Sequence, residues 1–423
     1  MIIDFSVENY RSIKERKTIN FIASSNSEQK DILLQTKEMS LVPSIGIYGA
    51  NAAGKSNILK ALHTFIELIS HSLMVPAGGS LHQNFFKFSG YSEKPTSFEI
   101  NFIENDVRYY YAIKYNANLI EKECLFCYPN GRKTIMFSRD YQKYDFKKDK
   151  ANLTQLAERT LPNRPFIVSA ADWNYKEIIT PFLFLTNTFT FRFRDPDHNW
   201  KEYTFRKILQ DNNFKEYVLK TVRNLKLDIS DIEVKIRDMG RNEIPSQFLD
   251  LIQQVSNVNT PLKATSTKVS TTHQVLVGDI VETAQFDFFK EESDGTQLLI
   301  EYLGPFYDIL KRGATLIIDE IETSLHIELV RYLIQIFHDK SLNTNGAQLL
   351  FTTHNVNLLD LSLFRRDQIW FAEKGKDGAS DYYSLFDFNG VRREENIMKG
   401  YLRGKFGAIP RLDITEETYN ERA

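Results

Sequence analysis

The chain has 423 residues, of which 42% are hydrophobic and 26% charged, a composition typical of a soluble globular protein with two or three domains, or one large domain with an inserted lobe. Lysine and arginine number 53 against 55 aspartate and glutamate residues, so the net charge of −2 excludes a global positive field that attracts nucleic acid, although a local basic groove stays compatible with it. No apolar run spans a bilayer and the N-terminus lacks a signal-peptide layout, so we expect a cytoplasmic protein with no membrane partner.

The first 23 residues alternate between apolar and polar side chains, a pattern that predicts a two-stranded hairpin with its tip at residues 9–13. Arg11 lies at this tip. Two interpretations of Arg11 stay open, a solvated tip residue and a contact to a bound phosphate.

The residues from Gly49 to Ser56 match the phosphate-binding pattern G-x-x-x-x-G-K-[ST] without a mismatch. A buried strand is predicted at 45–48 and a helix at 54–72, so backbone N–H groups and a helix N-terminus would face one bound polyphosphate. We expect Lys55 to reach the β- and γ-phosphates and Ser56 to ligate Mg²⁺. The predicted nucleotide contacts are Gly49, Asn51, Ala52, Ala53, Gly54, Lys55, Ser56 and Asn57.

The region after this helix predicts an antiparallel β lobe, with strands at 85–88, 97–102 and 108–115 and further strands to about 137. It contains both cysteines, Cys124 and Cys127. A lone C-x-x-C on a strand has no second ligand pair for zinc and does not open a helix, so we interpret the cysteines as two packed thiols.

Residues 138–275 predict a helical and irregular insertion, with helices between 200 and 224, a strand at 229–236 and a polar surface loop at 256–272. The segment contains no sustained heptads, which argues against a long coiled-coil arm.

Acidic and histidine side chains follow two apolar strands near the C-terminal end. The strand at 314–318 ends in Asp319 and Glu320, and the strand at 348–353 is followed by His354. At the carboxyl edge of a parallel sheet, Asp319 would hold Mg²⁺, Glu320 would orient or deprotonate the attacking water, and His354 would sense the γ-phosphate. We therefore assign catalytic roles to Lys55, Glu320 and His354.

A polar turn before a helix at 298 is the second predicted anion site, although most such turns only cap helices. The residues in question are Ser293, Gly295 and Thr296.

In this order, the motifs resemble an ABC-type ATPase, and the N-terminal hairpin resembles the SMC/RecF branch. More closely, the chain is similar to the stand-alone ABC-type ATPases of prokaryotic phage-defence cassettes, the RloA/AriA type. The matching stretches cover both ends of the chain: Val7–Ser12, Tyr48–Lys60, Glu292–Gln297, Ile318–His326, Phe351–Asn355, residues 365–371 and residues 401–410.

This resemblance implies an α/β fold, an ABC-type P-loop ATPase head with a mixed β lobe, a parallel-sheet core and a helical insertion. The domains expected are an N-terminal ATPase lobe at 1–137, the insertion at 138–275 and a C-terminal ATPase lobe at 276–423. The resemblance also implies ATP and Mg²⁺ as ligands and a homodimer that sandwiches ATP, with Ser293, Gly295 and Thr296 of one subunit facing the nucleotide of the other. Some relatives form rings of such dimers.

The function that the resemblance implies is a switch in anti-phage defence. ATP-dependent dimerisation would control a separately encoded effector, such as a Toprim-like nuclease, in response to a phage trigger protein. The alternative is a RecF/SMC-like ATPase of DNA repair or DNA ends, and DNA is the less favoured partner. A transporter motor is disfavoured by the hairpin and by the altered signature.

The sequence departs from the transporter pattern in two places. Ser293-Asp294 replaces the usual Leu-Ser-Gly-Gly opening, and Gln83 is the nearest candidate for a glutamine loop. The tail after His354 is too short for a Toprim domain and lacks a D-x-D cluster, so we expect that the chain is not itself a nuclease.

Overall fold

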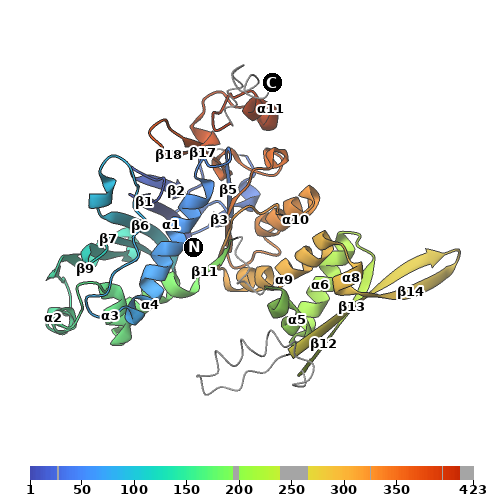
Figure 1. The fold of residues 1–423 in the computed structure, drawn as a ribbon, viewed down its shortest axis with the longest axis horizontal. Helices are drawn as coiled ribbons and strands as arrows, with labels where there is room; N and C mark the ends of the chain where they lie inside the picture. The colour runs from blue at the N-terminus through green and yellow to red at the C-terminus, as the bar shows by residue number, and fades with distance from the viewer. Residues whose placement is uncertain (26–27, 194–199, 239–264, 324, 393, 410–423) are drawn as a thin grey trace, which may run out of the picture. The chain divides into compact units, whose positions relative to one another are not determined.

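The computed structural model describes residues 1–25, 28–193, 200–238, 265–323, 325–392 and 394–409. The chain forms two compact units. The first comprises Met1–Asp195, Ile309–Thr323 and Val330–Ala423, and the second comprises Pro196–Asp308 and Ser324–Leu329. Figure 1 shows the elements of both units.

A six-stranded sheet forms the centre of the first unit. Its order is β11-β15-β16-β5-β17-β18, and every neighbouring pair is parallel except β17–β18. The three strands β5, β15 and β16 are buried along their whole length, as expected for parallel strands covered on both faces. The strands are β5 (Ser44–Tyr48), β11 (Phe189–Arg192), β15 (Thr315–Ile318), β16 (Gln348–Thr352), β17 (Ile369–Lys374) and β18 (Ser380–Ser384). The predicted parallel-sheet core is confirmed.

A seven-stranded antiparallel sheet forms the second layer, in the order β10-β9-β8-β7-β6-β1-β2. The predicted N-terminal hairpin is confirmed as β1 and β2, which pair antiparallel. The strands are β1 (Ile2–Glu8), β2 (Lys17–Asn20), β6 (Thr96–Glu104), β7 (Val107–Tyr115), β8 (Ile120–Tyr128), β9 (Thr134–Asp140) and β10 (Lys143–Asp145).

Aromatic side chains join this sheet to helix α1 (Lys55–Ser70). The Phe65 ring lies 5.9 Å from the ring of Phe5 and 5.5 Å from that of Phe98, measured between centroids. All three are buried, so the helix that follows the phosphate loop packs directly on the sheet that carries the N-terminal hairpin.

The predicted strand at 85–88 is wrong. These residues have no regular structure, because the backbone N–H of Phe86 donates to the side chain of Asn9 (2.9 Å) in place of a neighbouring strand. A short two-stranded sheet, β3 (Leu34–Gln35) with β4 (Ser40–Leu41), completes the strands of this unit.

A buried ion pair ties the antiparallel sheet to the helices after it. Glu123 on β8 lies 3.5 Å from the Arg139 guanidinium on β9, and its carboxylate accepts the N–H groups of Phe166 and Ile167 at the start of α3. Strands β9 and β10 extend the sheet past the predicted boundary at 137. Residues to 195 also fall in the first unit. The helices of this unit are α1, α2 (Lys150–Glu158), α3 (Phe166–Asp172), α4 (Lys176–Asn187), α11 (Ile397–Leu402) and most of α10 (Ile327–His338).

The second unit packs helices on a three-stranded antiparallel sheet of order β12-β13-β14. Phe205, Phe214 and Ile232 are among its buried core residues. Its elements are α5 (Trp200–Gln210), α6 (Asn212–Asn224), β12 (Ile229–Asp238), β13 (Thr265–Val277), β14 (Ile280–Asp287), α8 (Phe288–Glu291) and most of α9 (Asp294–Arg312).

One prediction for this region is wrong in part. Residues 265–272 of the predicted surface loop lie in strand β13, because threonine suits a pleated strand as well as a polar loop. Residues 256–264 lie outside the described residues. Within the described ranges, no helix combines the length and the hydropathy that crossing a bilayer requires.

Candidate nucleotide-binding site

The phosphate loop, residues Gly49–Ser56, connects β5 to α1 and needs glycine at both ends. A Cβ on Gly49 would lie 2.3 Å from the Ala372 carbonyl oxygen, and one on Gly54 would lie 2.1 Å from Ser380 Oγ. Gly54 also has φ of 100°, a conformation that other residues rarely adopt. The two glycines of the motif are therefore required by close packing behind the loop as well as by its turn.

A chain of hydrogen bonds holds the loop from behind. Asn57 Nδ2 donates to Ser12 Oγ (2.6 Å), Ser12 Oγ lies 2.7 Å from Ser380 Oγ, and Ser380 Oγ donates to the Ala53 carbonyl (2.7 Å). Tyr382 on β18 also donates to the Gly54 carbonyl (2.7 Å). The loop is thus held by the tip of the N-terminal hairpin and by strand β18.

Arg11 and Gln83, two residues that the sequence suggests for the nucleotide site, contact other parts of the protein in the structure. The Arg11 side chain is exposed, and its backbone N–H donates to the Asn84 carbonyl (2.7 Å). Its neighbour Ser12 makes the contact to the loop. Gln83 donates its amide to the Lys94 carbonyl (3.0 Å). The role of Arg11 in phosphate binding and the role of Gln83 as a glutamine loop stay predictions.

Lys55 is largely buried in the loop that it follows. It is 7% exposed, and its ammonium donates to the carbonyls of Gly49 (2.8 Å) and Ala50 (3.0 Å). Burial lowers the pKa of Lys55, while the carboxylates of Glu320, Glu322 and Asp319 act in the opposite direction. A cation held under such desolvation gains from a bound anion.

The structure brings Ser56 and the acidic strand end together. Ser56 Oγ donates to Asp319 Oδ1 (2.7 Å), and Thr352 Oγ1 donates to the same oxygen (2.6 Å). The Thr352 hydroxyl in turn accepts the backbone N–H of Glu320 (2.8 Å). Glu320 has φ of 55°, a strained conformation for a residue with a side chain.

A hydroxyl and a carboxylate at this distance suit Mg²⁺, which takes oxygen ligands and usually keeps waters and substrate phosphates as the others. Ser56 and Asp319 would hold the ion, and the ion would supply charge neutralisation beside the phosphates.

His354 is oriented by a carboxylate that the sequence analysis did not assign. Glu322 Oε1 lies 2.9 Å from His354 Nδ1 and accepts the His354 backbone N–H (2.7 Å). The Glu322 side chain is 7% exposed and that of His354 is 54% exposed. Glu322 Oε2 is buried and has no hydrogen-bond partner among the described residues. A buried carboxylate thus fixes the ring that faces solvent.

A cavity of about 730 Å³ opens beside the loop, a volume typical of small-molecule sites. Its lining combines the loop with His354, the end of β17 and the C-terminal segment: Gly49–Ala53, His354, Val356, Ala372–Lys374, Tyr401, Leu402, Ala408 and Ile409. The Ala408 carbonyl accepts the Ala50 N–H (2.9 Å), so the C-terminal segment contacts the loop directly.

The sequence matches the model of a known protein family over most of its length. Residues 44–360 match the model described as "AAA domain, putative AbiEii toxin, Type IV TA system". The chain belongs to this AAA family. Among solved structures, it is similar to the SMC head domain from Thermotoga maritima, with 12% sequence identity, coverage of 90% of this chain and 98% of that chain, and a TM-score of 0.42. The comparison with curated proteins finds no match.

The matched range of this AAA family contains the phosphate loop, the Asp319–Glu320 strand end and His354, all of which lie in the first unit. The predicted trans contacts belong to the second unit, at the start of α9. There Ser293 Oγ accepts the Thr296 N–H (3.1 Å) and lies 2.9 Å from Thr296 Oγ1. Ser293 is exposed, Gly295 is intermediate and Thr296 is buried, so Ser293 caps the helix and its role toward a second nucleotide stays a prediction.

Sequence reasoning missed Ser12, Thr352, Glu322, Ser380 and Tyr382. Ser12 was inside a block that resembled the family, and Glu322 and Thr352 were inside two others. Their hydroxyl and carboxyl groups are able to bind or position polar groups, and this is the signal in the sequence. The partners that make these residues important, however, lie far away in the sequence.

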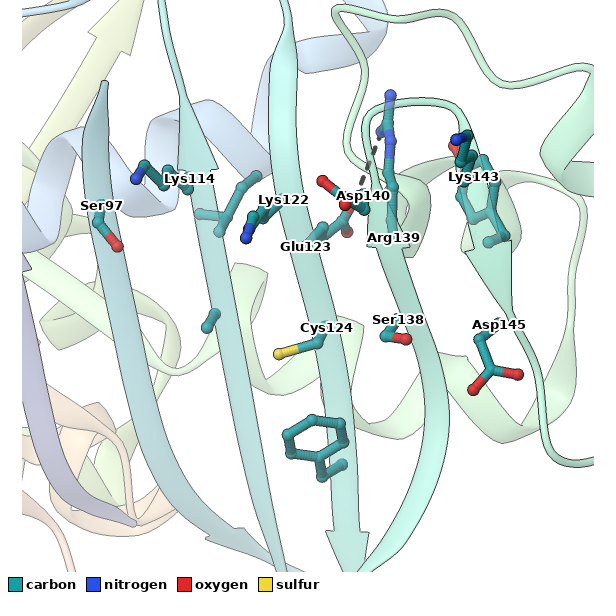
Figure 2. A pocket seen from close by; sticks show the side chains of 14 residues that line it. Ser97, Lys114, Lys122, Glu123, Cys124, Ser138, Arg139, Asp140, Lys143 and Asp145 are labelled. Atoms are coloured by element: carbon teal, nitrogen blue, oxygen red, sulfur yellow. Dashed lines mark ion pairs between the residues drawn. The ribbon is translucent and has the colours of Figure 1, made fainter. Parts of the chain in front are cut away.

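A second cavity, of about 590 Å³, lies on the outer face of the antiparallel sheet. Figure 2 shows Lys114, Lys122, Cys124 and Ser138 on neighbouring strands of this face. Burial raises the pKa of the Cys124 thiol to about 12, so it stays protonated and unreactive at neutral pH. Cys127 pairs with Tyr109 on β7 and points to the opposite face of β8, which supports the interpretation of two separate packed thiols.

Proposed function

We propose that this chain is an ATP-hydrolysing switch that acts through ATP-dependent dimerisation. The observation that carries the proposal is the hydrogen-bonded group of Ser56, Asp319, Thr352 and Glu320. It joins a complete phosphate loop to the two carboxylates that hydrolysis of a nucleoside triphosphate needs. Membership of the AAA family supports the same activity.

Each residue then has a role that its position supports. Lys55 neutralises the β- and γ-phosphates, and the loop N–H groups at the start of α1 bind them. Ser56 and Asp319 hold Mg²⁺. Glu320 accepts a proton from the attacking water, and His354, fixed by Glu322, donates to the γ-phosphate. A side chain that contacts the γ-phosphate makes this contact in the ATP state and loses it in the ADP state. The interaction free energy with the nucleotide therefore differs between the two states, as a switch requires.

The dimer is the ATP sandwich that the sequence resemblance implies. Ser293, Gly295 and Thr296 of a second copy would meet the γ-phosphate of the first, so that ATP binding closes the dimer and hydrolysis opens it. Higher rings of such dimers are compatible with this arrangement.

The biological role that we propose is control of a separately encoded effector, of the Toprim-like nuclease kind, in an anti-phage defence system with a phage protein as trigger. The resemblance of the motif blocks to the RloA/AriA type supports this role. The description of the matched family names a putative AbiEii toxin and a Type IV TA system. This description supports a function together with a separately encoded protein.

Steady-state ATP hydrolysis by the full chain, with and without linear double-stranded DNA, tests the proposal, with Glu320→Gln as the blank. We expect slow hydrolysis that requires Mg²⁺ and is indifferent to DNA. Glu320→Gln should bind ATP, hydrolyse it far more slowly and accumulate as a dimer in sizing experiments.

Two results contradict parts of this proposal. Wild-type turnover by Glu320→Gln would show that another group activates water. Strong stimulation by DNA would replace the switch by the RecF/SMC-like function at DNA ends or gaps.

A further inference from the structure

Strands β13 and β14 form a hairpin (Figure 1). Five aliphatic side chains at its tip are exposed. Leu276 is 72% exposed and Ile280 69%, and the remaining three are Val275, Val277 and Val281. The only charged residues between Val275 and Phe286 are Asp279 and Glu282. A fully exposed aliphatic side chain offers on the order of 100 Å² of apolar surface, so these five expose roughly 300 Å² in total. Because side chains alternate along a strand, Val275, Val277 and Ile280 lie on one face of the hairpin, and Leu276 and Val281 lie on the other.

The strand that carries part of this tip is also an edge. β14 is the last strand in the order β12-β13-β14, and residues 280–285 are exposed. Its register with β13 runs from Ser270–Asp287 to Val277–Ile280 without a bulge. Neither lysine nor proline occurs in β14. Edge strands that stay unpaired are normally protected by such residues or by bulges, so β14 is a strand suited to pairing.

We propose that two copies of this chain pair β14 with β14, antiparallel, around a twofold axis through Thr283. Such an axis places Thr283 beside Thr283 of the second copy and Ile280 beside Phe286 of the second copy. Threonine pairs and pairs of aromatic with β-branched residues are both favourable across strands. Val277 lies next to Ile280 on β13, so each end of the pairing forms a row of three apolar residues.

Neighbouring registers of the two β14 strands give less favourable side-chain pairs. An axis through Glu282 would place two carboxylates side by side, which is destabilising. An axis through Ala284 would move Ile280 opposite Phe288, which is already in helix α8. An axis through Val281 would place Ile280 opposite Glu282. The register centred on Thr283 uses the whole strand from 280 to 286 and places Glu282 opposite Ala284 of the second copy. The remaining carboxylate pair, Asp279 with Asp287 of the second copy, falls at the ends of the pairing, where Asp279 is an exposed turn residue.

The same residues argue for a second copy as the occupant. The strand provides its own complement, as an interface with twofold symmetry requires. A bilayer surface is disfavoured, because Asp279 and Glu282 are the charges at the tip and the peripheral membrane segments that bind anionic lipid are basic.

This dimer needs no nucleotide, and this separates it from the ATP sandwich of the proposed function. The test therefore uses the full chain without nucleotide and with Lys55→Ala, so that the sandwich does not form. Sedimentation equilibrium should show a monomer–dimer equilibrium. Thr283→Lys and Thr283→Glu should each weaken it roughly tenfold, because like charges then meet on the axis. An equimolar mixture of the two variants should restore it.

Cysteine pairs provide a second readout of the register, in a chain with Cys124→Ser and Cys127→Ser. Thr283→Cys should form an intermolecular disulfide on mild oxidation, because opposed residues have Cα atoms about 4.5–5.5 Å apart. Val281→Cys is the matched control. Its two copies would lie four residues apart along the strands, about 14 Å, and should not cross-link. A monomeric nucleotide-free chain, or charge variants that associate like the parent, would overturn the proposal. Equal cross-linking at both positions would overturn the register.

Discussion

Replacing Thr352 with valine tests the centre of the site, because the substitution exchanges only a hydroxyl group for a methyl group. Thr352 is fully buried at the end of β16. Its hydroxyl donates to Asp319 (2.6 Å) and accepts the backbone N–H of Glu320 (2.8 Å). Valine has nearly the same shape, so the substitution removes both hydrogen bonds while the packing of the strand stays close to that of the parent.

The expected magnitude follows from these two bonds. A hydrogen bond to a carboxylate contributes about 1.5–3 kcal/mol, and an unsatisfied buried N–H costs about 1–3 kcal/mol. If roughly half of this total is expressed at the transition state, Thr352→Val lowers kcat by about 10–100-fold, since 1.36 kcal/mol is tenfold in rate. The affinity for ATP should change little, because the loop and Lys55 are untouched.

Steady-state hydrolysis at saturating ATP measures kcat, and equilibrium binding of ATP in the absence of Mg²⁺ measures affinity. Thr353→Val is the matched control. Thr353 is equally buried, but its hydroxyl accepts the N–H of Asn355 (3.0 Å) and has no bond to either carboxylate. Wild-type kcat in a folded Thr352→Val protein, or an equal loss in Thr353→Val, would refute the assignment of Thr352 as the residue that positions Asp319 and Glu320.

Further predictions concern the phosphate loop, His354 and the pH dependence of stability. Lys55→Ala should abolish ATP binding in calorimetry, whereas His354→Ala should retain ATP affinity and slow turnover; a large affinity loss in His354→Ala would show that it packs the site. Gly54→Ala should lose ATP affinity with an unchanged circular dichroism spectrum, because its Cβ would lie 2.1 Å from Ser380 Oγ; wild-type affinity would refute the close packing. Burial lowers the pKa of His338 to about 4, so its neutral form stabilises the fold above pH ~6.5 and this stability is lost as pH falls toward 4, about 2 kcal/mol by pH ~5. Urea unfolding of His338→Gln should show a weaker pH dependence than that of the parent, and equal slopes would contradict this.

Much of the fold is predictable from local pattern. The strands 45–48, 314–318 and 348–353 are continuous apolar runs, and the structure buries β5, β15 and β16 completely. Residues 85–88 show where pattern fails. They include three phenylalanines, a residue type common in strands, but the Asn9 side chain accepts the N–H of Phe86 that a neighbouring strand would pair. A side chain 77 residues away has no local signal in the sequence.

The site divides in the same way. The phosphate loop, the Asp319–Glu320 pair and His354 are recognisable because a few residues at fixed spacing carry the chemistry. Their supporting residues are not. Thr352 looks like any threonine at a strand end until β16 is placed beside β15, and Glu322 becomes significant only when His354 lies 2.9 Å away.

The support behind the loop has a consequence for the proposed switch. Ser12 and Ser380 are 368 residues apart in sequence, yet their hydroxyls lie within 2.7 Å and lead to the Ala53 carbonyl. Ala50 is bound from the other side by the carbonyl of Ala408. Segments near both ends of the described chain therefore converge on one loop. A partner protein that displaced either segment would disturb phosphate binding without reaching the nucleotide, and a bound nucleotide that ordered the loop would stabilise both segments in return.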